Sequence, residues 1–284
     1  MRRLAAFLFL TAIATPALAQ TTINGGIIAN QTWTPAGSPY RILGDITVPS
    51  GQYLDIQAGT TIEVGTSDMQ GTGLDTGEVE ITINGSLHVL GTSGSPVTIR
   101  STTTGSGQWY GIVVGAMASE ATFAHTTIQS AQIGISSAAA GTALVLNDTT
   151  IHTCSSYGLY LSAGSPAPNR LTVYSCSDTG VRVDAAASVT LTNAILRNNS
   201  SYGLYVAHSA SSTADSTLAY STVYGNGYTG VWHQASGGTR ALRVRNSIVT
   251  NNTTYGIYKS GANGTLEVSN CDVWNNNSGT SYDI

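Results

Sequence analysis

Residues that could move a proton or hold a carboxylate recur at intervals of about two dozen positions. His125, Asp148 and Arg170 are separated by 23 and 22 residues. If each interval equals one turn of a stacked structure, base, acid and cation lie within ~10 Å of one another. The histidine or the carboxylate could then move a proton while the arginine neutralises a substrate carboxylate. This triplet is our hypothesis for a polysaccharide lyase or glycoside hydrolase acting on a polymer that contains uronic acids.

The same column continues with residues that carry no such chemistry. Its later members are Asn193, Tyr220, Asn246 and Asn270. Asparagine is typical of sharp corners, where varied polar side chains are tolerated. We therefore prefer a structural role for the column, keep catalysis as the alternative, and lean against an enzyme.

A second column combines aromatic rings with arginine. It holds the residues two positions after a recurring glycine, which are Tyr160, Arg182, Tyr205, Trp232 and Tyr258. Each stands between two apolar residues and should point outward from a strand. Such a row suits stacking on sugar faces and bonding to hydroxyls or carboxylates, so we predict carbohydrate binding. The alternative, cross-strand stacking that only stabilises the sheet, is the simpler explanation.

A further outward column has a similar make-up. It consists of His152, Tyr174, Arg197, Tyr224, Thr250 and Trp274.

The recurring glycine defines the repeat that positions these columns. Its members are Gly111, Gly134, Gly158, Gly180, Gly203, Gly230 and Gly256, at spacings of 23, 24, 22, 23, 27 and 26. Short apolar alternations separated by Ser, Asn, Gly and Thr stand between them, never the 3, 4, 7 spacing of a helix. A unit of this length holds about three short strands, and coiling such units stacks equivalent residues ~4.8 Å apart. The sequence therefore predicts an all-β solenoid, a parallel β-helix with coils of 22 to 27 residues.

Stacking predicts an internal asparagine ladder. Four successive coils carry Asn199, Asn226, Asn252 and Asn276 at the same position. An asparagine at a sharp corner tolerates the left-handed conformation, and its amide can hydrogen-bond the amides above and below. A polar stripe that binds a ligand is the alternative, but an interior amide stack needs no ligand.

Two cysteines occupy the ladder position in the preceding coils. Cys154 and Cys176 should lie ~4.8 Å apart, a separation that a disulfide permits. Parallel stacking aims their Cβ atoms the same way, so buried thiols are an equal alternative. Cys271 is left over as a core residue, and no CxxC or His/Cys cluster suggests zinc.

Two residues interrupt an inward apolar column. Three positions after the glycine, Leu161, Val183 and Val206 give way to His233 and Lys259. Because an unpaired charge is costly to bury, we expect the strand to end early here and both side chains to reach water.

The chain divides into a leader and one domain. Residues 1–19 contain Arg2, Arg3, an apolar run and Ala17-Leu18-Ala19, which predicts a secretory signal peptide. The apolar run is too short to span a membrane. Residues 20–64, which include Trp33 and several prolines, should form an N-terminal cap and irregular first coils. Residues 65–284 should continue the same solenoid.

Composition narrows the function classes. Only 9% of the residues are charged and the net charge is −4, so nothing indicates a nucleic-acid partner. The acidic residues do not cluster in sequence, so we expect no cofactor; calcium is possible, but no motif supports it.

Three segments near the start of the mature chain carry a family resemblance. They are S-P-Y-R-I-L-G-D-I-T-V-P-S-G-Q-Y-L-D-I-Q-A-G-T-T-I-E-V (38–64), I-N-G-S-L-H-V-L-G-T-S-G-S-P-V-T-I (83–99) and W-Y-G-I (109–112). With the later coils, the chain resembles secreted bacterial right-handed parallel β-helix proteins of the pectin-lyase-like kind. The resemblance implies a right-handed coil outside a bacterial cell, in a family of lyases, hydrolases and adhesins.

The resemblance also implies what an enzyme of this family would need. Pectate-lyase-like members use clustered acidic calcium ligands beside a basic residue, and polygalacturonase-like members use paired aspartates with G-H-G. This sequence has neither G-H-G nor an Asp-Asp pair. We therefore expect a secreted or cell-surface protein for recognition, adhesion or structure that contacts polysaccharide or a surface protein. The last coil has no obvious covering helix, so we expect either that Tyr282 to Ile284 folds across it as a closing segment or that this end packs against a partner, which could be another copy bound end to end.

Overall fold

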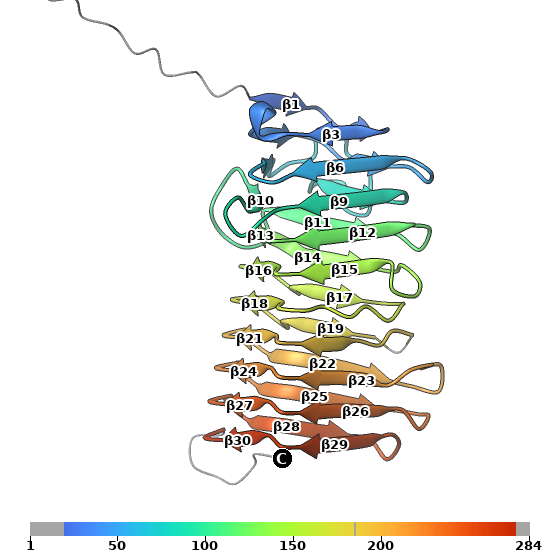
Figure 1. Cartoon of the computed structure of the whole chain (residues 1–284), viewed down its shortest axis with the longest axis vertical. Helices are drawn as coiled ribbons and strands as arrows, with labels where there is room; N and C mark the ends of the chain where they lie inside the picture. The colour runs from blue at the N-terminus through green and yellow to red at the C-terminus, as the bar shows by residue number, and fades with distance from the viewer. Residues whose placement is uncertain (1–19, 185, 277–284) are drawn as a thin grey trace, which may run out of the picture.

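The described part of the chain, residues 20–184 and 186–276, forms a parallel β-helix in a computed structural model. Short strands stack into three sheets, A, B and C, that run the length of the molecule (Figure 1). Along the chain, strands of sheets C, A and B follow one another in most coils, as β20, β21 and β22 do. The predicted all-β parallel β-helix is confirmed.

Sheets A and B contain one strand from almost every coil. Sheet A consists of β1 (Thr21–Ile23), β4 (Tyr40–Ile42), β7 (Thr61–Val64), β10 (Val97–Ser101), β13 (Thr126–Gln129), β16 (Thr150–His152), β18 (Thr172–Tyr174), β21 (Ile195–Arg197), β24 (Thr222–Tyr224), β27 (Ile248–Thr250) and β30 (Asp272–Trp274). Sheet B consists of β2 (Gly26–Ile27), β5 (Ile46–Val48), β8 (Glu80–Ile83), β11 (Trp109–Val114), β14 (Ala131–Ser137), β17 (Leu159–Leu161), β19 (Val181–Val183), β22 (Tyr202–His208), β25 (Thr229–Ala235) and β28 (Tyr255–Ser260).

Sheet C is divided into two parts. The first part consists of β3 (Gln31–Trp33), β6 (Tyr53–Gln57), β9 (Ser86–Leu90), β12 (Glu120–Ala124) and β15 (Leu144–Asn147). The second consists of β20 (Thr190–Thr192), β23 (Ser216–Ala219), β26 (Ala241–Arg245) and β29 (Thr265–Ser269). Asn169 forms single bridges to Asn147 and to Thr192, so the stack continues between the two parts.

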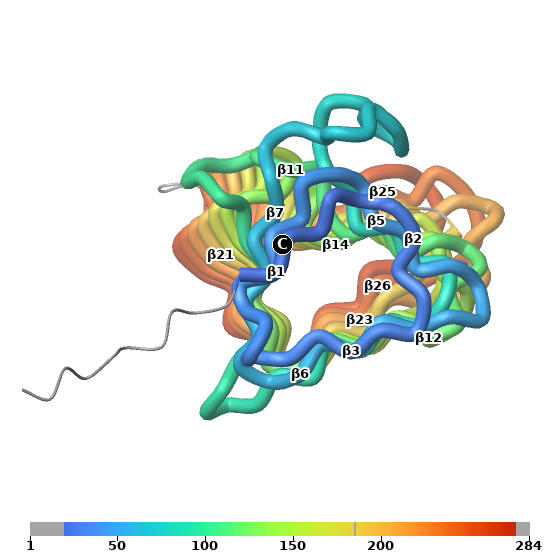
Figure 2. The backbone as a smooth tube through the Cα atoms, turned by 90° about the horizontal axis from the view of Figure 1, so that it is seen from above, coloured from blue at the N-terminus to red at the C-terminus, as the bar shows by residue number. Residues whose placement is uncertain are grey.

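Alternating side chains build the core. In β17, Leu159 and Leu161 are buried while Tyr160 between them faces outward, and β19 repeats this arrangement with Val181 and Val183. Inward residues of successive coils pair in register, so apolar side chains stack into columns. Viewed along the axis, the three sheets surround an interior that these side chains fill, while loops project outside (Figure 2).

The recurring glycine is explained by the distance between coils. A Cβ atom on Gly203 would lie 2.7 Å from the carbonyl oxygen of Gly230, and one on Gly230 would lie 2.7 Å from that of Gly256. Gly158 and Gly180 have the same conflict with the next coil, at 2.8 Å each. Any side chain here would push the stacked strands apart, which is why the marker is glycine.

The predicted asparagine ladder is formed by hydrogen bonds. Nδ2 of Asn199 donates to Oδ1 of Asn226 at 3.1 Å, and Nδ2 of Asn226 donates to Oδ1 of Asn252 at 2.9 Å. Asn252 donates to Asn276 at 2.9 Å, and all four residues are buried. Backbone N–H groups of the ladder also donate to the next side chain, so polar groups that no strand partner reaches are satisfied.

The backbone conformation assigned to the ladder was wrong. The left-handed residue is the one directly before each ladder asparagine, with φ of 53° at Asn198, 57° at Asn251 and 54° at Asn275. The exposed residue makes the sharp turn, and that turn aims the following side chain into the interior.

Residues 20–64 already pair within the same sheets. Strand β1 pairs with β4 and β4 with β7, while Trp33 stacks on Tyr40 at 4.7 Å beside the short helix η1 (Pro35–Gly37). The predicted signal peptide and the predicted closing segment Tyr282 to Ile284 lie outside the described residues. Within residues 20–276, apart from 185, no helix has the length and apolar character that a membrane crossing requires.

Candidate functional site

The predicted aromatic column lies in one row on the outward surface of sheet B. Tyr160 pairs with Arg182, Arg182 with Tyr205, Tyr205 with Trp232 and Trp232 with Tyr258, each in the next coil. All five side chains are half-buried. The row therefore presents rings and one guanidinium parallel to the axis, one residue per coil.

A second set of tyrosines widens this row. The Trp232 ring meets Tyr202 edge-on at 5.2 Å and stacks with Tyr228 at 5.8 Å, while Tyr255 stacks on Tyr258 at 4.6 Å. Sequence reasoning missed these residues, although Tyr202 and Tyr255 stand directly before the recurring glycine. The aromatic face, as we use the term, comprises Tyr157, Tyr160, Arg182, Tyr202, Tyr205, Tyr228, Trp232, Tyr255 and Tyr258.

Asp184 sets the electrostatics of the aromatic face. It accepts a hydrogen bond from the Tyr160 hydroxyl at 2.7 Å, which raises the pKa of Tyr160 to about 12. Its other oxygen accepts from Nε of Arg182 at 3.1 Å. The Arg182 guanidinium also lies 4.9 Å from the centre of the Tyr205 ring. The one cation of this face is therefore already neutralised, and rings and hydroxyls dominate its chemistry.

His125, Asp148 and Arg170 are brought together at a left-handed corner between sheets C and A. Their φ angles are 43°, 50° and 56°. Arg170 binds both oxygens of Asp148, with Nε to Oδ1 at 2.5 Å and Nη2 to Oδ2 at 2.6 Å. Nε2 of His125 lies 3.7 Å from Oδ2 of Asp148.

This geometry limits what the corner can do. The Arg170 hydrogen bonds hold the pKa of Asp148 below its usual range, so the carboxylate is ionised at neutral pH and is a weak base. The guanidinium that would neutralise a substrate is already occupied by Asp148. Asn193 and Tyr220 continue the column in the same conformation, so the corner shape does not depend on the triplet. Catalysis at this corner stays a prediction.

Comparisons with known proteins agree with the observed coil. The family model described as "Right handed beta helix region" matches residues 170–283. No curated protein matches the sequence significantly. Among solved structures, a variant of the periplasmic alginate epimerase AlgG is 9% identical, with a TM-score of 0.56 over 88% of this chain and 77% of that one. The chain has a right-handed β-helix fold.

Two further structures resemble this β-helix. A second variant of the same epimerase is 8% identical, with a TM-score of 0.55 over 91% of this chain and 79% of that one. The pectate lyase Pel9A is 15% identical, with a TM-score of 0.48 over 89% and 82% of the two chains. At such identities the similarity shows the fold alone.

The cysteines of the β-helix are free thiols, so no disulfide joins Cys154 to Cys176. Both are buried, and each Sγ donates to a backbone carbonyl within its own coil, at 3.8 Å. The neighbouring Cys176 thiol and burial raise the pKa of the Cys154 thiol well above its usual value. Parallel in-register stacking aims the two Cβ atoms the same way, which favours two separate thiols over a disulfide.

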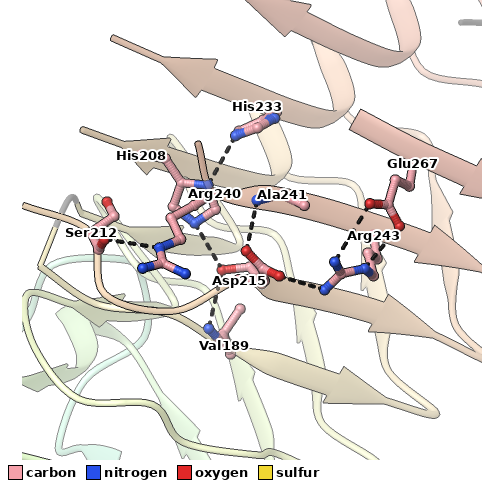
Figure 3. A network of polar contacts seen from close by, with 10 residues as sticks. Val189, His208, Ser212, Asp215, His233, Arg240, Ala241, Arg243 and Glu267 are labelled. Atoms are coloured by element: carbon pink, nitrogen blue, oxygen red, sulfur yellow. Dashed lines mark hydrogen bonds and ion pairs between the residues drawn. The ribbon is translucent and has the colours of Figure 1, made fainter. Parts of the chain in front are cut away.

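The expectation that His233 reaches water was wrong. Strand β25 continues to Ala235, and His233 is completely buried beside His208 (Figure 3). Nδ1 of His208 lies 3.0 Å from Nε2 of His233, and Nε2 of His208 lies 3.4 Å from the Ser216 hydroxyl. A buried imidazole can lose its proton at neutral pH at little cost, because its usual pKa is close to 7, whereas a buried lysine needs a much larger pKa shift. Lys259 instead leans outward and donates to the Gly261 carbonyl at 2.8 Å.

Two further contacts complete the surroundings of this pair. The Ser216 hydroxyl, which lies against His208 Nε2, also accepts a hydrogen bond from the Val189 N–H at 3.3 Å. The remaining nitrogen, Nδ1 of His233, is buried without a hydrogen-bond partner.

Residues 20–184 and 186–276 contain no group of side chains arranged to bind a metal ion. No three His, Cys, Asp or Glu side chains in these ranges converge as metal ligands would.

Proposed function

We propose that this protein is exported and binds polysaccharide through the aromatic face, as a recognition, adhesion or structural component at the bacterial surface. The carrying observation is the in-register row of Tyr160, Arg182, Tyr205, Trp232 and Tyr258 along the axis of sheet B.

The chemistry of the face supports this proposal. Aromatic rings cover the apolar faces of sugar rings, while hydroxyl and amide groups at the edges bond their hydroxyls. Trp232 Nε1 donates to Ser260 at 3.0 Å, and the Tyr205 hydroxyl contacts Gln234, so polar groups border the rings. Because Asp184 neutralises Arg182, neutral sugars fit this face better than acidic ones.

Export of the protein is supported by the N-terminal sequence and by the fold. The leader pattern of residues 1–19 is that of a secretory signal. The similar epimerase structure is described as periplasmic.

The experiment compares a double variant, Tyr205→Ala with Trp232→Ala, with the unaltered protein on a glycan array and by calorimetric titration of the best neutral glycan. If each ring contributes about 1 kcal/mol to binding, the double variant should bind roughly thirtyfold more weakly. The control is Tyr220→Ala, which removes an exposed tyrosine at the corner between sheets C and A.

Three results would count against the proposal. The first is that no glycan binds. The second is that the double variant binds as the unaltered protein does but melts at a lower temperature, which indicates cross-strand stacking alone. The third is that the protein releases unsaturated uronides, detected by their ultraviolet absorbance, and that Arg170→Ala abolishes this release. The last result would make the protein a lyase.

A further inference from the structure

The outward surface of sheet A changes in character along the axis. Its strands stack along the left-hand edge of the molecule in Figure 1. The first outward position of five successive strands is a threonine, and these are Thr61, Thr98, Thr127, Thr150 and Thr172. The next three strands carry Ile195, Thr222 and Ile248 at that position. Isoleucine has the β-branched shape of threonine but lacks the hydroxyl group that suits a strand surface in water.

Apolar side chains are exposed on this half of sheet A. Ile195 is 40% exposed, Ile248 44% and Trp274 49%. We call the outward side chains of β18, β21, β24, β27 and β30 the sheet A patch. A protein that stays monomeric rarely exposes such a contiguous apolar group, so the patch is a candidate interaction surface.

The sheet A patch is symmetric about β24. Ile195 and Ile248 lie one coil to either side of Thr222 at the first outward position. Such a surface can face a copy of itself across a two-fold axis that runs parallel to the strands through β24. Each isoleucine then packs on the other isoleucine of the second copy, and the two central threonines meet at the axis.

The second outward position follows the same symmetry. Tyr174 and Trp274 lie two coils to either side of Tyr224. Across the same axis, Tyr224 meets its equivalent in the second copy, and Tyr174 of each copy meets Trp274 of the other. Aromatic rings therefore face aromatic rings, which stabilises a contact beyond the area it buries.

Charges are also complementary across this axis. Within residues 20–184 and 186–276, neither Arg197 nor Asp272 forms an ion pair. The Arg197 guanidinium lies 4.1 Å from the centre of the Tyr174 ring, so it points toward β18 and away from β30 of its own chain. In the symmetric arrangement, β18 faces β30 of the second copy, which brings Arg197 beside the exposed Asp272 of that copy.

We propose that two copies of this chain form a symmetric dimer through the sheet A patch, with the axes of the two β-helices antiparallel. Ile195 of each copy packs on Ile248 of the other, and Arg197 of each copy pairs with Asp272 of the other. The patch contains five strands of three residues, so it measures about 19 Å by about 10 Å. This is smaller than the surface of a permanent dimer, so the association is reversible, with a dissociation constant of about 10 μM.

The rest of the surface stays outside this contact. A groove of about 400 Å³ on sheet A is lined by residues that include Arg100, Gln129 and His152 and by the loop 101–105. The strands β10, β13 and β16 that carry these side chains precede β18, so the second copy does not cover them. The aromatic face lies on sheet B, so the dimer does not depend on the proposed glycan binding.

The test is sedimentation velocity of the full-length protein at concentrations from about 1 to about 200 μM, where the dimer fraction should rise with concentration. The double variant Ile195→Thr, Ile248→Thr restores the threonine of the neighbouring coils. It should weaken association about a hundredfold, because four isoleucines leave the contact. The control Ile27→Thr removes an isoleucine that is 65% exposed on sheet B and should associate as the unaltered protein does.

A charge exchange tests how the two copies are placed. Arg197→Asp should weaken association about tenfold, because it brings two carboxylates together in each half of the contact. Addition of Asp272→Arg should restore the association, since each pair then again combines opposite charges.

Three results would overturn the inference. The first is that the protein stays monomeric at every concentration. The second is that Ile27→Thr weakens association as much as the Ile195→Thr, Ile248→Thr variant does. The third is that the charge-exchanged variant associates no better than Arg197→Asp alone. Melting temperatures identify any variant that fails to fold, and if the double threonine variant fails, the charge exchange decides.

Discussion

Lowering the pH from 7 to 4 should destabilise this β-helix through the buried pair of His208 and His233. Burial, His208 and Lys259 together lower the pKa of His233 to about 4. Burial likewise lowers the pKa of His208, although Asp215 opposes that effect and Arg240 adds to it. Burial outweighs the charge of Asp215 near the pair (Figure 3), so both rings are neutral in the folded protein at pH 7.

The sign and the size follow from the difference between folded and unfolded chains. An unfolded histidine has a pKa of about 6.5, so below that pH the unfolded chain binds a proton at position 233 that the folded chain does not bind. Stability is therefore fully present above about pH 6.5 and falls until about pH 4, where the folded ring also protonates. A pKa displaced from 6.5 to about 4 corresponds to a loss of about 3 kcal/mol, and His208 adds to it in the same direction.

The assay is urea unfolding at several pH values between 7 and 4, followed by circular dichroism. The matched variant replaces His208 with Ala and His233 with Val, because Ala235 pairs with His208 in the next coil and Val206 pairs with His233 in the preceding one. Each protein is compared with its own free energy of unfolding at pH 7, so any packing cost of the substitutions cancels. Carboxylates common to both proteins contribute equally to their pH profiles.

We expect the unaltered protein to lose about 3 kcal/mol more than the double variant between pH 7 and pH 4. Equal losses in the two proteins would refute the argument, since the pair would then not hold the lowered pKa that its burial implies. A larger loss in the variant would show that the pair is protonated and stabilising in the folded state.

Two further predictions concern the interior column. Asn226→Ala should lower the free energy of unfolding in urea by about 3 kcal/mol, because it leaves the backbone N–H and Nδ2 of Asn199 without their acceptor. The exposed control Asn263→Ala should change that free energy by less than about 0.5 kcal/mol. Similar losses in both variants would contradict a structural ladder. Denatured protein without reductant should show three reactive thiols in a colorimetric titration, because all three cysteines are free, and a count of one would reveal a disulfide.

Local repetition made the coil predictable. The recurring glycine marks seven successive coils, the asparagine column marks the last four, and apolar alternation accompanies both at constant offsets. The glycine leaves room for the neighbouring carbonyl, and the asparagine satisfies polar groups at the corner. The repeat alone therefore places residues such as Tyr205 and Trp232 in one row.

Contacts that depend on geometry between columns could not be predicted. No pattern in the sequence joins Asp184 to Arg182 and Tyr160, because the orientation of each side chain across neighbouring coils decides that contact. The same holds for His208 and His233, since only the length of β25 shows that the inward column continues to position 233.

The sequence alone determined that this chain stacks like residues over like at a period of 22 to 27, because that pattern is repeated in the chain itself. Only the tertiary structure decided which charges are neutralised, which histidines are buried and where a groove opens. Loops such as residues 101–105, which differ from coil to coil, help to form that groove, and a periodic pattern carries no information about parts of the chain that do not repeat.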